Sequence, residues 1–189
     1  MRIGLLGGSF NPAHAGHRHI SLLAQARLRL DVVWWLVTPG NPLKDHAELA
    51  AMERRLANAQ AVAGHPRIRV TGYEAAIGTT YTADTLEKLT AQCPSVRFVW
   101  LMGADNLATF HHWDRWRDIA RTIPFAVLDR PGATLRALSA PAAQALARFR
   151  IPEFEAETLP DRAPPAWVFL FGPRSPESST RLRQLARHP

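Results

Sequence analysis

The stretch GLLGGSFNPAHAGH, from Gly4 to His17, begins as an apolar run, opens into paired glycines and ends with two histidines three residues apart. The run up to Gly7 is typical of a short buried strand, and the residues after the second histidine have the apolar spacing of a helix. Because glycine carries no Cβ, Gly7 and Gly8 are expected to let a ligand lie against the main chain. The amides that open the helix favour phosphate oxygens. The stretch therefore predicts a strand, a phosphate-binding loop and a helix, with His14 and His17 facing one phosphate chain.

Two common phosphate-loop patterns do not match this stretch. No lysine follows the glycines, as G-x-x-x-x-G-K-[ST] requires, and glycines at positions 4, 7 and 8 do not fit G-x-G-x-x-G. Taken alone, the two histidines also resemble a metal-binding pair or a chance surface pair. With no cysteine or carboxylate nearby they make an incomplete metal site, so we predict no metal centre in the protein.

Strand and helix patterns alternate along most of the chain. Strands are predicted at residues 2–7, 31–38, 67–72, 96–102, 125–128 and 166–171, and helices at 16–30, 48–63, 82–91 (capped by Thr82), 113–121, 141–150 and 178–187. Apart from its alanine-rich helix, the segment 131–165 has no regular pattern. The alternation predicts an α/β fold: a Rossmann-like, doubly wound parallel sheet with helices on both faces, in a single domain over residues 1–189.

The ligand site of such a sheet lies beyond the carboxyl ends of its strands, near the point where the strand order reverses. This rule brings five loops to one rim: 4–17, 38–45, 72–82, 103–113 and 171–179. These loops hold most of the glycines, histidines and hydroxyl side chains that chemistry would use.

Composition limits the class of protein. With 189 residues, 47% of them apolar, the chain is long enough for one well-buried core. A single cysteine, Cys93, excludes an internal disulfide framework, and the sequence lacks a signal peptide and a long apolar run. We therefore expect a soluble, cytoplasmic protein that does not bind membranes. The net charge of +7, in which arginine dominates, favours nucleic acid or small phosphorylated partners. A genome whose base composition favours arginine and alanine explains the charge equally well.

Two segments together resemble a known family. GGSFNPAHAGH resembles the GG-[ST]-F-[DN]-P-x-H-x-G-H signature of the nucleotidyltransferases related to class I aminoacyl-tRNA synthetases. SSTRLR (178–183) resembles their second signature, I-S-S-T-x-[IL]-R, with Glu177 in the place of isoleucine. Within that superfamily the chain is most similar to the bacterial nicotinate-nucleotide adenylyltransferases, through TPGNPLK (38–44), TYTADTL (80–86), MGADNLATFHHW (102–113) and DRPG (129–132).

The resemblance implies transfer of AMP from ATP to the 5′-phosphate of nicotinate mononucleotide, giving deamido-NAD and pyrophosphate. The attacking phosphate is already an anion at neutral pH, so positioning and charge neutralisation are expected to supply the catalysis. Mg²⁺ is expected to arrive with the ATP and to keep mostly water and phosphate ligands.

The resemblance also implies which residues do this. Catalysis is assigned to His14, His17, Lys44 and Arg183. ATP binding is assigned to Gly7, Gly8, Ser9, Phe10, His14, His17, Asp105, Ser179, Thr180 and Arg183. Binding of nicotinate mononucleotide is assigned to Lys44, Tyr81, Thr82, Thr85, Trp113 and Arg130.

Some of these residues have alternative roles. Asp105 suits a ribose hydroxyl, the ordering of its loop, or the N-cap of the following segment. Tyr81, Thr82 and Thr85 are expected either to contact the nicotinate carboxylate or to order the loop that does. Of the two tryptophans in WDRW, Trp113 is expected to stack on the pyridine ring and Trp116 to lie in the core.

Three other functions share some features with this sequence. Pantetheine-phosphate adenylyltransferases share the superfamily signature but resemble T-x-G-H and lack the TYTADTL segment. A class I aminoacyl-tRNA synthetase needs a K-M-S-K-S-type loop and an anticodon-binding domain, for which 189 residues leave no room. A basic nucleic-acid-binding module fits the charge, yet the sequence has no RNP-like aromatics, helix-turn-helix spacing or concentrated basic stripe. We therefore expect ATP and nicotinate mononucleotide as partners rather than nucleic acid.

Overall fold

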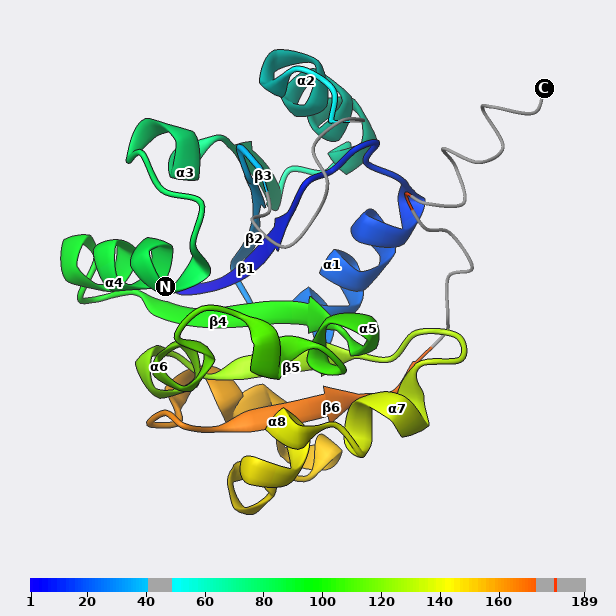
Figure 1. Cartoon of the computed structure of the whole chain (residues 1–189), viewed down its shortest axis with the longest axis vertical. Helices are drawn as coiled ribbons and strands as arrows, with labels where there is room; N and C mark the ends of the chain where they lie inside the picture. The colour runs from blue at the N-terminus through cyan, green and yellow to red at the C-terminus, as the bar shows by residue number, and fades with distance from the viewer. Residues whose placement is uncertain (41–48, 173–178, 180–189) are drawn as a thin grey trace.

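The computed structural model describes residues 1–40, 49–172 and 179. Its described strands form one parallel sheet in the order β3-β2-β1-β4-β5-β6 (Figure 1). The strands are β1 (Arg2–Gly8), β2 (Val32–Val37), β3 (Ile68–Thr71), β4 (Arg97–Gly103), β5 (Phe125–Leu128) and β6 (Trp167–Leu170). The chain winds outward from β1 in one direction and returns to β4 on the other side of it, so the order reverses between β1 and β4. The predicted α/β fold class is confirmed.

Both faces of this sheet are buried, which explains why its strands read as continuous apolar runs rather than alternating patterns. Leu5 of β1 belongs to one core cluster, and its neighbour Leu6 belongs to the cluster on the opposite face. The same alternation places Trp34 of β2 against the first cluster and Trp35 in the second.

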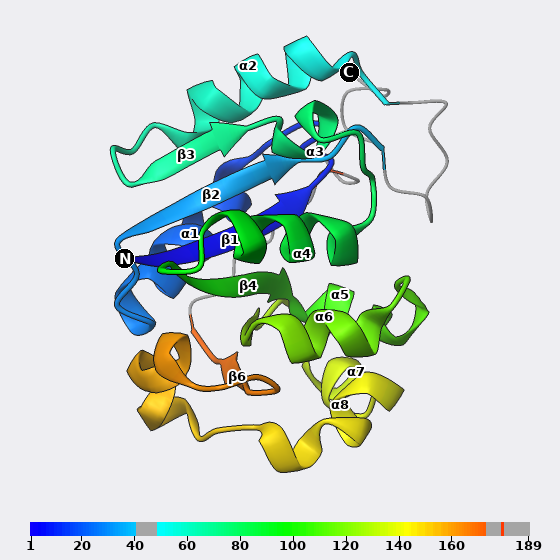
Figure 2. The same cartoon turned by 90° about the vertical axis from the view of Figure 1, so that its left-hand side faces the viewer.

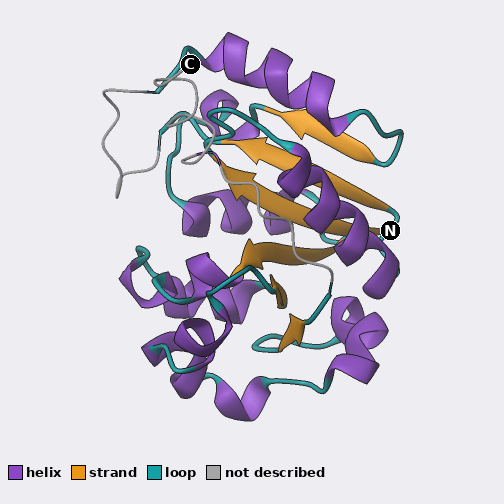
Figure 3. Ribbon diagram, turned by 90° about the vertical axis from the view of Figure 1, so that its right-hand side faces the viewer, coloured by secondary structure: helices purple, strands orange, loops and turns teal. Residues whose placement is uncertain are grey.

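Helices cover the two faces in separate layers (Figures 1 and 2). One face packs against α1 (Ala15–Arg27), α2 (Met52–Ala63) and the 3₁₀ segment η3 (Glu153–Asp161). The other face packs against α3 (Tyr73–Ala76), α4 (Thr82–Gln92), α5 (Ala104–Leu107), η1 (Phe110–His112), α6 (Trp116–Thr122), α7 (Thr134–Leu138), α8 (Pro141–Ala145) and η2 (Ala147–Phe149). Figure 3 shows the twisted sheet between the two layers.

The predicted helix 113–121 is wrong at its start. α6 begins only at Trp116, because Arg115 adopts a left-handed conformation with φ of 48°. Its guanidinium forms ion pairs with Asp84 and, at 2.9 Å, with Glu87 of α4, which hold the turn in place. Trp113 instead ends the 3₁₀ turn η1. The two tryptophans therefore stand on different elements.

The remaining corrections are local. The predicted helix 141–150 divides into α8 and the 3₁₀ turn η2, and the segment expected to be irregular contains α7 and η3. The short helices α3 and α5 were not predicted. The N-cap of α4 is Tyr81 rather than Thr82. At this end of the helix, the Thr79 hydroxyl accepts a hydrogen bond from the Tyr81 amide at 3.2 Å and donates one to Asp84 at 3.0 Å.

Apart from residue 179, the predicted helix 178–187 lies outside the described residues. In the described part of the chain, no helix combines the length and apolar character needed to cross a membrane.

Candidate active site

A cleft of about 480 Å³ opens at the carboxyl ends of β1, β2 and β4, where the strand order reverses. In a parallel sheet, ligand sites lie beyond the carboxyl ends of the strands, near the point where the strand order reverses, and the cleft occupies this position. Four of the five predicted loops contribute to it. Its described lining residues are Gly7, Gly8, Ser9, Thr38, Glu74, Thr80, Tyr81, Thr82, Trp100, Asn106, His112, Trp113, Asp114 and Ile119.

The two glycines at the end of β1 are required for different reasons. A Cβ on Gly7 would lie 2.5 Å from a ring carbon of Trp100, so this position is kept small by the protein's own core. A Cβ on Gly8 would approach nothing closer than the Phe10 ring, at 3.4 Å. Both glycines were expected to leave room for a ligand, and the geometry leaves only Gly8 open for it.

This difference predicts opposite effects of two matched substitutions. Gly7→Ala is expected to destabilise the protein by about 1–3 kcal/mol, because the added methyl overpacks against Trp100. Gly8→Ala is expected to change the free energy of unfolding by less than about 0.5 kcal/mol, yet to weaken ATP binding by crowding the cleft. Urea unfolding and the KM for ATP separate the two variants. If Gly8→Ala unfolds as easily as Gly7→Ala, the open position at Gly8 is wrong.

Aromatic rings surround His17 beside the paired glycines Gly7 and Gly8. Its imidazole lies 3.9 Å from the His14 ring, 4.7 Å from Phe10 and 5.9 Å from Trp35, between ring centroids. One turn further along α1, the Ser21 hydroxyl donates to the His17 carbonyl oxygen and accepts from the Trp35 indole, both at 2.8 Å. These two hydrogen bonds fix the helix backbone to β2. The ring is thus positioned by its contacts with buried side chains.

The protonation state of His17 follows from these neighbours. Burial, the neighbouring His14 and the positive charge of Arg130 lower the pKa of His17 from 6.5 to about 3. Its Nδ1 accepts from the His14 amide at 3.2 Å, so the single proton of the neutral ring resides on Nε2. At neutral pH His17 is therefore an uncharged donor, suited to a phosphate oxygen.

Phe10 occupies a conformation that few side chains adopt. Its φ is 45°, in the left-handed region, and its ring is buried and stacked on Trp35 at 4.9 Å. The packing of the ring holds the strained loop in shape. The structure therefore places the Phe10 side chain in the core beneath the loop, away from the open cleft.

The first loop and the C-terminal segment meet in space. Ser179 Oγ donates to the carbonyl oxygen of Pro12 at 2.9 Å, across 167 positions of sequence. His14, the N-cap of α1, is buried in the same loop. Ser179 thus joins the two segments that carry the sequence signatures. Lys44, Thr180 and Arg183 lie outside the described residues.

Asp105 and Arg130 face each other at the neighbouring edge. An Arg130 guanidinium nitrogen lies 3.4 Å from both carboxylate oxygens of Asp105. The N-cap of α5 is Gly103, so the alternative role of Asp105 as an N-cap is wrong. Neither residue is among the described lining of the cleft, although Arg130 is close enough to affect the pKa of His17.

The far wall of the cleft comes from residues 80–82, at the start of α4, and from Trp113. Trp113 is partly buried and meets Phe110 and Trp100 edge-on, with centroids 5.4 Å and 6.3 Å away. Tyr81 and Thr82 line the cleft as expected. Thr85 does not, because its hydroxyl is buried behind the wall against Glu74 and the Tyr81 carbonyl oxygen. The geometry thus favours the loop-ordering role of Thr85.

Sequence reasoning missed several residues of the cleft. Thr38, Glu74, Thr80, Asn106, His112 and Asp114 line it, and all except Asp114 belong to the loops predicted on the rim. It also missed Arg55, a buried arginine of α2. Its guanidinium donates to the carbonyl oxygens of Ser9 and Thr38, at 2.9 Å and 2.7 Å, and so ties the loops after β1 and β2 together. An arginine within an amphipathic helix gives no sequence signal for such a role.

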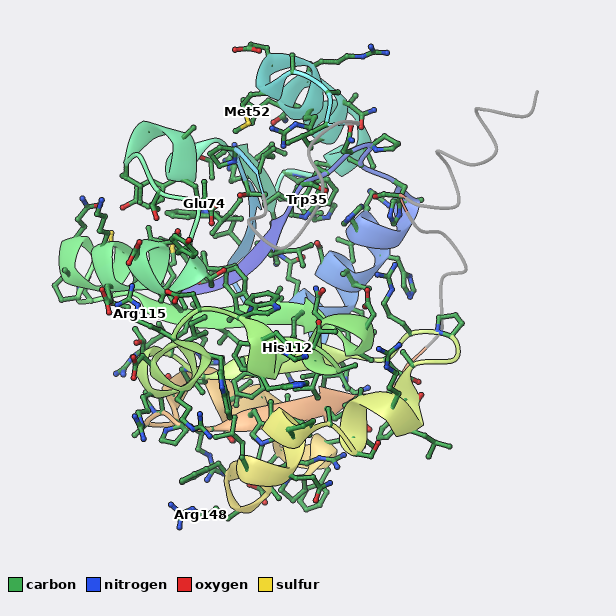
Figure 4. All side chains as sticks on the ribbon, in the orientation of Figure 1. Trp35, Met52, Glu74, His112, Arg115 and Arg148 are labelled. Carbon is green, nitrogen blue, oxygen red and sulfur yellow. The ribbon has the colours of Figure 1, made fainter. Side chains whose placement is uncertain are left out.

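No group of three His, Cys, Asp or Glu side chains suited to a metal ion occurs among the described residues. Glu74 and His112 both line the cleft, and Figure 4 shows Glu74 near α3 and His112 on the other side of β4. The site is therefore built from glycine backbone, a neutral histidine, hydroxyl groups and an aromatic wall.

Comparisons with known proteins agree with this geometry. The family model described as cytidylyltransferase-like matches residues 5–185. A protein of Methylorubrum extorquens, named "probable nicotinate-nucleotide adenylyltransferase", is 63% identical over 97% of this chain and 99% of its own. A protein of the same name from Agrobacterium fabrum is 55% identical over 97% of this chain and 98% of its own.

A solved structure shares the fold. It is the nicotinic acid mononucleotide adenylyltransferase of Plasmodium falciparum complexed with NaAD, with a TM-score of 0.71 and 16% identity over 97% of this chain and 82% of that one. At that identity the match supports the architecture, and the sequence relatives supply the family. The chain belongs to the nicotinate-nucleotide adenylyltransferases, within the cytidylyltransferase-like family.

Proposed function

We propose that this protein transfers the adenylyl group of ATP to nicotinate mononucleotide, forming deamido-NAD and pyrophosphate in NAD biosynthesis. The observation that carries the proposal is the division of the cleft into two ends. One end offers the open backbone of Gly8 near the neutral donor His17, and the other offers the Trp113 ring beside the start of α4. The first end suits the phosphates of ATP, and the second suits a pyridine ring.

In the proposed reaction, an oxygen of the mononucleotide 5′-phosphate attacks the α-phosphorus of ATP. The new P–O bond forms as the bond from the α-phosphorus to the bridging oxygen breaks, and pyrophosphate leaves with that electron pair. No proton has to be removed from the nucleophile, so the protein is required to align two anions and offset their charge. A neutral Nε2–H donor held by buried rings needs no reorganisation to stabilise the developing charge.

The remaining roles are proposals of the same kind. Near the phosphate end, His14, Ser179 and Arg130 lie around the first loop or close to His17. We propose that Lys44, Thr180 and Arg183 complete the phosphate site, as the family signature implies. We propose that Mg²⁺ arrives with the ATP substrate and keeps phosphate and water as its main ligands.

The test is pyrophosphate release from ATP by the purified full-length chain. Release that depends on nicotinate mononucleotide supports the proposal. Release that depends on phosphopantetheine instead supports the pantetheine-phosphate adenylyltransferase alternative. Absence of release with either acceptor contradicts both.

The acid mononucleotide is expected to be preferred over its amide form. Backbone amides and hydroxyls at the start of α4 are donors, and an anionic carboxylate gains more from them than an amide that also carries unmatched N–H groups. Such a mismatch costs about 1–3 kcal/mol, or roughly ten- to a hundredfold in kcat/KM. Equal kcat/KM for the two mononucleotides would show that this wall does not read the pyridine substituent.

We further propose that the positive charge serves these phosphorylated substrates rather than nucleic acid or a membrane surface, and that the reaction takes place in the cytoplasm. The charge of +7 lowers the cost of bringing two phosphorylated molecules into one cleft.

A further inference from the structure

Glu74 is the one described acidic side chain that is buried in the wall of the cleft. It belongs to the short helix α3 (Figure 4), which packs beside the end of β2. Only 3% of its surface is exposed. Its Oε2 has no hydrogen-bond partner among the described residues and no exposed surface of its own. A carboxylate in such a place is costly unless it is paired or neutral.

The second oxygen of Glu74 leads to the substrate wall through Thr85. Glu74 Oε1 lies 3.2 Å from the Thr85 hydroxyl, and that hydroxyl lies 3.1 Å from the carbonyl oxygen of Tyr81. Tyr81 precedes the first turn of α4, and residues 80–82 line the cleft. The three groups thus connect α3 to the segment that meets the pyridine end of the substrate.

The number of hydrogens available between Glu74, Thr85 and Tyr81 determines which of these contacts are hydrogen bonds. The Thr85 hydroxyl has one hydrogen, so beside an ionised Glu74 it donates either to that carboxylate or to the Tyr81 carbonyl oxygen, which already accepts from the Thr85 amide at 3.1 Å. If Glu74 carries a proton on Oε1, it donates to Thr85, and the Thr85 hydrogen then goes to Tyr81. Both short contacts become hydrogen bonds only in this state.

Among the described residues, no charged group favours ionisation of Glu74. The Thr38 hydroxyl at the end of β2 donates to the Gly40 carbonyl oxygen at 3.2 Å. On α2, the Arg55 guanidinium is bound to main-chain oxygens, including that of Thr38 at 2.7 Å. Burial raises the pKa of Glu74, and the nearby Thr85 and Thr38 hydroxyls offset this in part although Thr38 donates its hydrogen to Gly40; no charged group of the described chain is among the causes.

The other acidic groups nearby have partners of their own. On α4, Asp84 forms an ion pair with Arg115 and accepts from Thr79 at 3.0 Å. On α3, the Tyr73 hydroxyl donates to Gln92 at 2.8 Å. None of these groups is placed to pair with Glu74.

We propose that Glu74 is a positioning residue that works in its protonated form: its proton orders the chain Glu74–Thr85–Tyr81 and thereby sets the pyridine-side wall of the cleft. The neutral state also keeps a negative charge out of a wall that has to receive an anionic nicotinate carboxylate. The role at the substrate rests on the proposed function, whereas the protonation is a property of the folded chain alone.

The first test compares isosteric variants in the steady-state assay. Glu74→Gln replaces the O–H donor by an N–H donor and is expected to keep the KM for nicotinate mononucleotide within about twofold. Glu74→Ala and Thr85→Val break the chain and are expected to raise that KM about tenfold or more, with kcat changed less than about threefold. The double variant should be no worse than the poorer single variant, because both remove the same connection. If Glu74→Gln raises KM as much as Glu74→Ala, a charged carboxylate is required and the proposal is overturned.

The second test needs no substrate. An acid whose pKa is raised on folding loses stability as pH rises from its ordinary value, 4.5 for Glu74, towards the raised one, because the unfolded chain releases its proton first. Urea unfolding between pH 4.5 and 8 should therefore show the wild-type protein losing stability relative to Glu74→Gln. Parallel curves would mean that Glu74 is ionised in the folded protein, whether or not the chain uses nicotinate mononucleotide. A chain inactive towards that substrate would contradict the proposed function and leave this measurement intact.

Discussion

Replacing His17 by alanine is expected to lower kcat about a hundredfold or more, because it removes a donor aimed at charge that develops in the transition state. The His17 ring is already oriented, with Nδ1 engaged by the His14 amide and Nε2–H left as the donor. The loss should therefore fall on kcat more than on the KM for ATP. His14→Ala and Arg183→Ala should place a larger share of their loss in ATP binding.

Two measurements make this result specific. His17→Gln restores an N–H donor near the position of Nε2 and should recover part of kcat. Unfolding of both variants shows whether loss of the ring contacts with Phe10 and Trp35 has disturbed the loop. Near-normal turnover by a folded His17→Ala protein would remove His17 from the catalytic machinery.

Trp116→Ala is expected to reduce stability by about 3–5 kcal/mol, towards the lower end because 9% of the residue is exposed. The indole packs on Phe110, 5.8 Å away between centroids, and Phe110 packs on Phe125 of β5. For a chain of this length the loss corresponds to a Tm lower by roughly 6–20 °C. The KM for nicotinate mononucleotide should change little at temperatures where the variant stays folded.

Trp113→Ala is the matched control, and its expected effect is the opposite. The ring lines the cleft, and loss of stacking on a pyridine ring, worth about 1–3 kcal/mol, should raise the KM for nicotinate mononucleotide roughly ten- to a hundredfold. Its Tm should fall less than that of Trp116→Ala. Fluorescence quenching by the mononucleotide should persist in Trp116→Ala and disappear in Trp113→Ala. The reverse pattern would exchange the two roles.

Local patterns in the sequence were sufficient for the architecture. Each strand is a short apolar run and most helices have a periodic apolar face, so the order of elements, and with it a doubly wound parallel sheet, could be predicted. The position of the glycine loop between β1 and α1 could be predicted too, because glycines between a strand and a helix place open backbone at the carboxyl end of that strand. The errors fall on short helices, where a few residues carry no period. They also fall at Arg115, whose left-handed turn is held by ion pairs with α4 that are distant in sequence.

The details of the site required the tertiary structure, because they depend on contacts between residues far apart in the chain. The residues near Gly7 in the sequence do not indicate that the Trp100 ring fills the space beside it. They also do not indicate that Gly8 has no such neighbour. The histidine pair was visible, but the low pKa of His17 comes from rings and charges that the fold gathers around it. Glu74 looks like an ordinary polar residue of a loop until β2 and α4 enclose it. Sequence alone determined which backbone surrounds the cleft, and packing decided which side chains face it and in which protonation state, since burial and hydrogen bonding are properties of the assembled fold.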